Sequence, residues 1–168
     1  LVDRAYAADL GGQVYRIDFE GEGGATLAAD KWTIHKIADL SGGTSTGRKF
    51  FYAPDVIPTK DFVAVMIGSG DREKPLLSAT QDHFFQIFDQ RVSKGAPASA
   101  APVLWSGLTE MTQQPNVSSN GCYMALAQGE KVVNAATSIG GRSYFGTNRP
   151  AAGSSMSCSA NLGVAKTY

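Results

Sequence analysis

Three segments of the sequence repeat one plan, in which a short strand, a tight turn and a second strand follow one another. The first is RAYAADLGGQVYRIDF at residues 4–19. The second joins FVAVMIGSG to DHFFQIFD, and the third joins RSYFGTN to NLGVAKTY. Alternating apolar and polar residues mark the strands, and glycine or proline occupies the turns. A further strand follows each of the first two units, namely KWTIHKIADL and GCYMALA.

Four-stranded units that recur at roughly 40–60 residues are typical of the blades of a β-propeller. The 168 residues hold about two and a half such units, whereas a closed propeller needs about four or more. We therefore predict an all-β fold, part of a β-propeller with about two and a half four-stranded antiparallel blades. Residues 1–168 would form one domain that is incomplete at both ends, with a long inter-strand loop at residues 91–120.

Composition and charge exclude several classes of partner. Lysine and arginine total 15, as do aspartate and glutamate, so the formal net charge is zero and no basic excess points to nucleic acid. The apolar runs are far too short to span a bilayer. The sequence therefore indicates a globular domain that binds no nucleic acid and has no membrane-spanning segment.

The candidate motifs for phosphate or metal binding are weak. Residues 42–49, GGTSTGRK, have the glycine spacing of a phosphate-binding loop. However, Arg48 and Lys49 stand where lysine and a hydroxyl residue are required, so we interpret this segment as a plain loop. His35 and His83 are far apart in the sequence and lack a neighbouring cysteine or second histidine. We expect structural roles for both, with a metal pair or a catalytic base as the minor alternative.

The candidate catalytic residues are equally unspecific. No G-x-S-x-G motif surrounds Ser69 or Ser154. Asp71, Arg72 and Glu73 form a charged turn, which we expect to stabilise the loop by local hydrogen bonds. The two cysteines of the chain are compatible with one disulfide, although buried free thiols fit the sequence about equally well.

Three stretches carry more information than a generic propeller repeat. They are DRAYAADLGGQVYRIDF, then VMIGSGDREKPL with DHFFQIFDQ, then GEKVVNAATSIGGRSYFGTNRP. In this order they resemble the C-terminal domain of the PilC/PilY family, the tip-associated adhesins of type IV pili, over nearly the whole chain. Residues 68–76 and 146–150 are the more family-specific parts, whereas residues 6–19 are similar to quinoprotein repeats in general.

The resemblance implies a modified β-propeller without catalytic activity, exported to the pilus tip or cell surface, and outer-membrane-associated or periplasmic in transit. Its implied role is in pilus biogenesis, retraction control, surface adhesion and virulence. The implied partners are minor pilins at the pilus tip, a host or abiotic surface, and the remainder of its own propeller. Residues 91–120 are the segment that we expect to contact a partner.

The resemblance also implies calcium. In many members an acidic loop of the form D-x-[DN]-x-D-G-x-x-D directly precedes the strand that reads RxYAxDLGG. Asp3 would supply the last carboxylate of that loop and Leu1 a backbone carbonyl. Calcium takes about six to eight oxygen ligands, so most of them would lie outside this chain, in a loop just upstream of or at Leu1. The alternative is that Asp3 is merely a solvated residue near the start of a strand.

Export would also bear on the cysteines, because a protein with only two cysteines tends to oxidise them in an oxidising compartment. The resemblance therefore favours a disulfide between Cys122 and Cys158, with Cys122 as a buried free thiol as the alternative.

Two rival functions remain open. One is a quinoprotein-like propeller enzyme, which would need a planar cofactor stacked on tryptophan and a calcium site in a central channel. The other is a structural propeller of an outer-membrane assembly machine. The segment GSGDREKPL is foreign to quinoproteins, which disfavours the enzyme.

Overall fold

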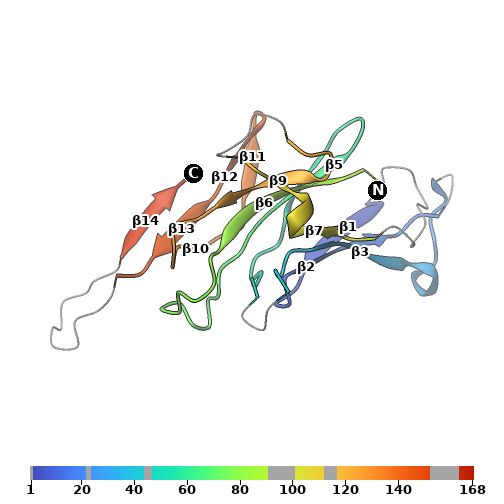
Figure 1. Ribbon diagram of the computed structural model, residues 1–168. Coiled ribbons are helices and arrows are strands. Elements are labelled where there is room, and N and C mark those ends of the chain that lie inside the picture. The colour runs from blue at the N-terminus through green and yellow to red at the C-terminus, as the bar shows by residue number, and fades with distance from the viewer. Residues whose placement is uncertain (1, 22–23, 44–46, 91–100, 112–116, 152–162) are drawn as a thin grey trace.

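The computed structural model describes residues 2–21, 24–43, 47–90, 101–111, 117–151 and 163–168. In these parts the chain forms strands arranged in four sheets, with 3-10 turns at Ala29–Lys31 and Trp105–Gly107 (Figure 1). No helix in the described part of the chain is long and apolar enough to cross a membrane.

The first sheet contains the hairpin that opens the chain. Its strands lie in the order β1 (Arg4–Ala8), β2 (Gln13–Asp18), β3 (Thr33–Asp39) and β7 (Val103–Leu104). The hairpin turn places Gly12 at φ +80°, a conformation that L side chains rarely adopt. The predicted hairpin and the strand that follows it are therefore confirmed.

The central sheet is built around the second repeat. Its order is β4 (Asp55–Pro58), β5 (Val63–Gly68), β6 (His83–Asp89), β9 (Gly121–Ala125) and β8 (Thr109–Glu110). Strands β5 and β6 form the predicted antiparallel pair, and β9 adds to β6 as the predicted outer strand. The repeat read from the sequence did not contain β4, which pairs with β5 ahead of the unit.

The third sheet has the order β10 (Lys131–Val132), β13 (Gly146–Arg149) and β14 (Val164–Thr167). The antiparallel pair of β13 and β14 is the third predicted unit. A separate hairpin of β11 (Thr137–Ile139) and β12 (Arg142–Tyr144) is inserted between β10 and β13.

The predicted strand RSYFGTN and the segment VVNAATSI are each divided between two strands. VVNAATSI is split between β10 and β11, and RSYFGTN between β12 and β13. The division lies at Asn134, whose side-chain oxygen accepts the backbone N–H of Gly146 at 2.7 Å. This side-chain contact replaces a ladder hydrogen bond, so the chain leaves the sheet there and returns after the hairpin.

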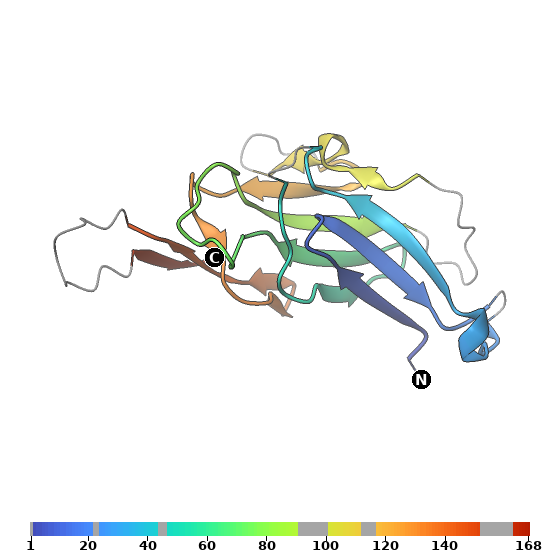
Figure 2. The same ribbon diagram turned by 90° about the horizontal axis from the view of Figure 1, so that it is seen from below.

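Two short strand pairs run parallel, a detail that the sequence did not predict. Residues 101–111 form an insert between β6 and β9, and each of its two short strands adds to a different sheet. Strand β7 pairs parallel with β3, and β8 pairs parallel with β9. One insert therefore extends both the first and the central sheet, as its placement beside both sheets shows in Figure 2.

The sheets pack in layers, with the central sheet covered on both faces (Figures 1 and 2). The core on one face combines residues of the first and central sheets, including Val14, Ile37, Leu40, Val65, Ile67, Phe85 and Ile87. The core on the other face combines Met66, Phe84, Leu126, Val132 and Phe145. Every residue of β5 is buried, which confirms the prediction from its nearly continuous apolar sequence.

A cluster of charged side chains lies between the first and central sheets. Arg16 of β2 is fully buried. Its guanidinium lies 2.9 Å from Asp18 Oδ2 and 2.9 Å from Asp89 Oδ2, the latter at the end of β6. Tyr6 donates to the same Asp89 oxygen at 3.0 Å, and Arg4 lies 3.1 Å from Asp18 Oδ1. This charged cluster joins the two sheets directly.

We expect Arg16→Met to lower the free energy of unfolding by about 3–5 kcal/mol, because it leaves two buried carboxylates without their principal counter-charge. Urea unfolding of the full chain measures the change. The matched control is Lys36→Met, which removes a partly exposed ion pair with Asp39 of 3.7 Å and should cost less than about 1 kcal/mol. Equal losses in the two variants would contradict a structural role for the buried cluster.

Candidate functional site at the junction of two sheets

The turn after β5 brings three segments of backbone together. The N–H of Ser69 donates to the carbonyl of His83 at 2.9 Å, and its carbonyl accepts the N–H of Val132 at 3.1 Å. The next residue, Gly70, donates to the carbonyl of Lys49 at 3.0 Å. The turn therefore links β6, the start of the third sheet and the segment that precedes β4.

Two glycines permit this close approach. A Cβ atom on Gly68 would overlap the side chain of Val132, and one on Gly70 would lie 2.8 Å from Cβ of Lys131. Both contacts are closer than real Cβ atoms show. The sequence GSG is thus explained by β10, which passes directly over the turn.

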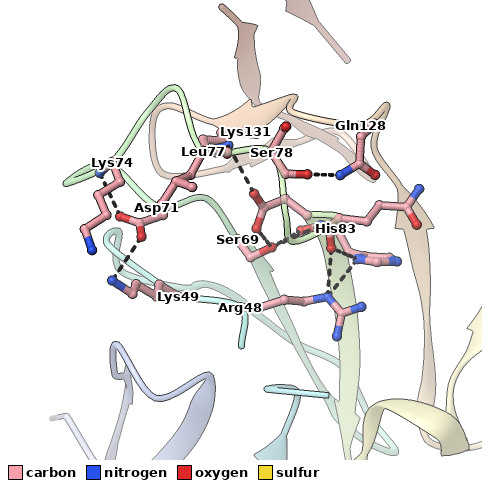
Figure 3. A network of polar contacts seen from close by, with 12 residues as sticks. Arg48, Lys49, Ser69, Asp71, Lys74, Leu77, Ser78, His83, Gln128 and Lys131 are labelled. Atoms are coloured by element: carbon pink, nitrogen blue, oxygen red, sulfur yellow. Dashed lines mark hydrogen bonds and ion pairs between the residues drawn. The ribbon is translucent and has the colours of Figure 1, made fainter. Parts of the chain in front are cut away.

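Asp82, Ser69 and Lys131 form a buried polar group beneath the turn (Figure 3). Ser69 Oγ donates to Asp82 Oδ1 at 2.7 Å, and Lys131 Nζ lies 4.0 Å from Asp82 Oδ2. Lys131 also donates to the backbone carbonyl of Leu77. Burial raises the pKa of Asp82, although the hydrogen bond from Ser69 and the charge of Lys131 oppose that shift.

The charged turn above this group is held by local hydrogen bonds, as expected from the sequence. Asp71 Oδ1 accepts the backbone N–H groups of Glu73 and Lys74 at 3.0 and 3.1 Å. Lys49 Nζ lies 3.0 Å from both the Asp71 and the Glu73 carboxylates. Burial opposes ionisation of Asp71, but the hydrogen bonds from Lys49, Lys74 and Glu73 outweigh it and lower its pKa.

These groups line a pocket of about 170 Å³ whose charged side chains are Lys49, Lys74, Lys131, Asp71 and Asp82. Figure 3 shows the side chains of Lys49 and Asp71 on one side of the network and Lys131 on another. Both carboxylates of the pocket already contact a lysine. The arrangement therefore suits polar contacts to a partner and the fixing of the junction, rather than proton transfer.

Arg48 is the residue of this region whose role sequence reasoning missed. Its Nε donates to His83 Nδ1 at 2.8 Å, and its Nη1 donates to the carbonyl of Leu40 at 3.1 Å. Its guanidinium carbon also lies 4.5 Å from the ring centroid of Trp105, in the insert. The segment that resembled a phosphate-binding loop thus contributes a buried cation that joins the first sheet, the central sheet and the insert.

The two histidines serve separate structural contacts. His35 lies on β3, with Nε2 3.0 Å from Thr33 Oγ1 and 3.5 Å from Asp18. His83 lies on β6, and burial together with the charge of Arg48 lowers its pKa to about 4. It is therefore neutral at neutral pH and accepts a hydrogen bond through Nδ1. Within the described ranges, no group of three His, Cys, Asp or Glu side chains could hold a metal ion.

The other residues singled out from the sequence lie apart from this junction. Asp3 is exposed just before β1, and its backbone carbonyl accepts the N–H of Phe19 at 3.0 Å. Cys122 lies buried on β9. Leu1, Ser154 and Cys158 lie outside the described residues, so the calcium loop and the disulfide stay predictions.

We expect the folded chain to lose stability as the pH falls from about 6.5 to about 4. The pKa of His83 is lowered from 6.5 to about 4 in the folded state, so in this window the unfolded chain binds a proton that the folded chain does not. Full protonation of His83 in the unfolded state alone would lower the free energy of unfolding by on the order of 3 kcal/mol.

The measurement is urea unfolding between pH 4 and 7, with His83→Gln as the comparison. Gln keeps an acceptor for Arg48 but has no proton to bind. The free energy of unfolding of the variant should therefore depend less steeply on pH than that of the parent. Burial raises the pKa of Asp82, so its protonation favours the folded state as the pH falls. This contribution is present in both proteins and does not affect their difference. Identical slopes would contradict the prediction.

Comparison with known proteins bears on the fold. No protein-family model and no curated protein matches the sequence. Among solved structures, the C-terminal domain of Pseudomonas aeruginosa PilY1 matches with a TM-score of 0.70 and 18% sequence identity. The match covers 88% of this chain and 41% of that chain, so the present chain spans less than half of the PilY1 domain.

The family resemblance read from the sequence is thus confirmed at the level of the fold. The predicted fold class is confirmed as well, because the described residues form several small sheets and no closed barrel. The chain has the fold of part of the PilY1 C-terminal domain, an incomplete β-propeller.

Proposed function

We propose that this chain is part of an exported, type IV pilus-associated protein that acts by binding and assembly rather than by catalysis. Its proposed roles are in pilus biogenesis, retraction control and surface adhesion. The observation that carries the proposal is the structural match to the PilY1 C-terminal domain over 88% of the chain. The remainder of the propeller, minor pilins at the pilus tip and a host or abiotic surface are its proposed partners.

The layered sheets support a role in binding. A propeller holds its loops on a rigid frame, where they can contact a partner. Within the 91–120 segment, Leu104, Met111 and Val117 are about half exposed. These apolar side chains, carried on an insert that is anchored to two sheets, are the part of the described chain that we propose contacts a partner.

The contacts at the junction of the central and third sheets support the non-catalytic part of the proposal. Ser69 is fully buried and donates to Asp82, while His83 accepts from Arg48. These groups contact one another across strands, which is an arrangement that stabilises a fold.

The experiment that tests the proposed function is deletion of the gene for the full-length protein in the bacterium that makes it. We expect fewer surface pili by shearing and electron microscopy, and reduced twitching motility and attachment. Complementation with the parent gene should restore all three. Normal pili in the deletion strain, together with a loss of outer-membrane proteins, would instead favour an assembly-machine propeller. A quinone-like absorbance of the pure protein, with oxidation of an alcohol or sugar, would favour the enzyme.

We also propose that calcium binds at the loop to which Asp3 belongs. Support comes from the position of Asp3, exposed immediately before β1, and from the resemblance of LVDRAYAADLGG to the family pattern. Isothermal calorimetry on the full-length protein should show calcium binding that Asp3→Ala weakens about tenfold or more, because one carboxylate ligand is lost.

Asp61→Ala is the matched control, because Asp61 is also an exposed aspartate beside a strand. This substitution should leave the calcium affinity unchanged. Equal affinities in the parent, Asp3→Ala and Asp61→Ala proteins would remove Asp3 from the calcium site.

A further inference from the structure

The most exposed large apolar side chain in the described part of the chain is that of Leu76, which is 77% exposed. It lies in the loop between β5 and β6, and the next residue, Leu77, is 51% exposed. Single exposed leucines are common on protein surfaces, so the role of Leu76 depends on what surrounds it.

The loop that carries Leu76 is fixed by contacts at both of its ends. At its start, the carboxylate of Asp71 accepts two backbone N–H groups of the same turn. At its end, the side chains of Lys131 and Gln128 each donate to a backbone carbonyl of the loop (Figure 3). A partner that covers Leu76 would therefore not have to order the loop first, which lowers the entropic cost of binding.

Leu76 borders a pocket of about 370 Å³ between this loop and the end of β13, which we call the loop–β13 pocket. Pro75 and Leu76 line it from the loop, and Arg149 and Pro150 line it from the end of β13. No aspartate or glutamate is among the described residues that line it. The pocket therefore combines an apolar wall with one basic side chain.

Positive charge is in excess around the loop–β13 pocket. Both carboxylates of the loop contact Lys49 at 3.0 Å. By contrast, Arg72, Lys74 and Arg149 form no ion pair with any described side chain. The chain as a whole carries no net charge, so this excess is local. It would attract a partner that carries carboxylates.

Two other classes of ligand fit this surface less well. A single-stranded nucleic acid binds through aromatic side chains on which its bases stack, and none of the described residues that line the pocket is aromatic. An anionic membrane attracts exposed leucines and basic side chains together, but a flat bilayer does not fill a hollow such as the one beside Leu76. A protein segment that places one side chain in the pocket matches the hollow, the apolar wall and the charge.

We propose that the loop–β13 pocket binds an acidic segment of a partner protein that carries an apolar side chain. The apolar side chain of the segment packs between Leu76 and the two prolines of the pocket. Carboxylates that flank it on the segment contact Arg149 and the basic residues of the loop. The proposal rests only on residues of this chain, and it holds whether or not the partner belongs to a pilus.

The apolar and the charged contacts have different effects on binding. Burial of Leu76 removes apolar surface from water and supplies most of the affinity. The exposed basic side chains mainly steer the encounter, and added salt weakens their contribution. This surface shares no residue with the exposed apolar side chains of the 91–120 segment, so the two contact surfaces can be altered separately.

The test is selection of a displayed library of random peptides on the full-length protein, with counter-selection on its Leu76→Ser variant. We expect the enriched peptides to combine an apolar residue with flanking carboxylates. Fluorescence polarisation of the labelled peptides then measures affinity. Leu76→Ser should weaken binding about tenfold or more. Arg149→Gln should weaken it about threefold at low salt, and this smaller effect should shrink as the salt concentration rises.

Matched variants separate a local contact from a general loss of apolar surface or charge. Leu10→Ser changes an exposed leucine in the turn between β1 and β2, and Lys60→Gln changes an exposed lysine between β4 and β5. Both should leave the peptide affinity unchanged, and all four variants should keep the thermal midpoint of the parent because the altered side chains are exposed. Three results would each overturn the proposal: enrichment of no peptide that distinguishes the parent from Leu76→Ser, enrichment of basic peptides, or binding to vesicles of anionic phospholipid that depends on Leu76 while no peptide binds.

Discussion

Burial of the central sheet on both of its faces is the constraint on which the other sheets depend. Val65 of β5 belongs to the core shared with the first sheet, whereas Met66, the next residue, belongs to the core shared with the third sheet. Alternate residues of one strand therefore hold two neighbouring layers. A single repeat unit has no such arrangement, because its sheet would leave one apolar face in water.

The parts of the fold that were predictable from sequence are those encoded by local patterns. The hairpin of β1 and β2 follows from alternation around Gly12, and the burial of β5 from its nearly continuous apolar residues. The charged turn at Asp71 also follows from local chemistry, because its carboxylate bonds to backbone N–H groups two and three residues on. Each of these features depends on residues that are close together in the chain.

The features that sequence reasoning missed depend on contacts between distant segments. The buried face of β2 carries Arg16 and Asp18 beside Val14, and alternation alone does not predict that charged residues lie on the buried face. Only Asp89, from the other sheet, explains that choice. Arg48 is a similar case, since its partner His83 lies on a strand 35 residues later.

The insert between β6 and β9 has a mechanical consequence. Its strands β7 and β8 extend the first and the central sheet respectively. A force that separates these two sheets would act across their packed faces. Such a force must also break the hydrogen bonds of the two short parallel strand pairs formed by the insert. The insert therefore acts as a clamp that resists separation of the first two layers under force.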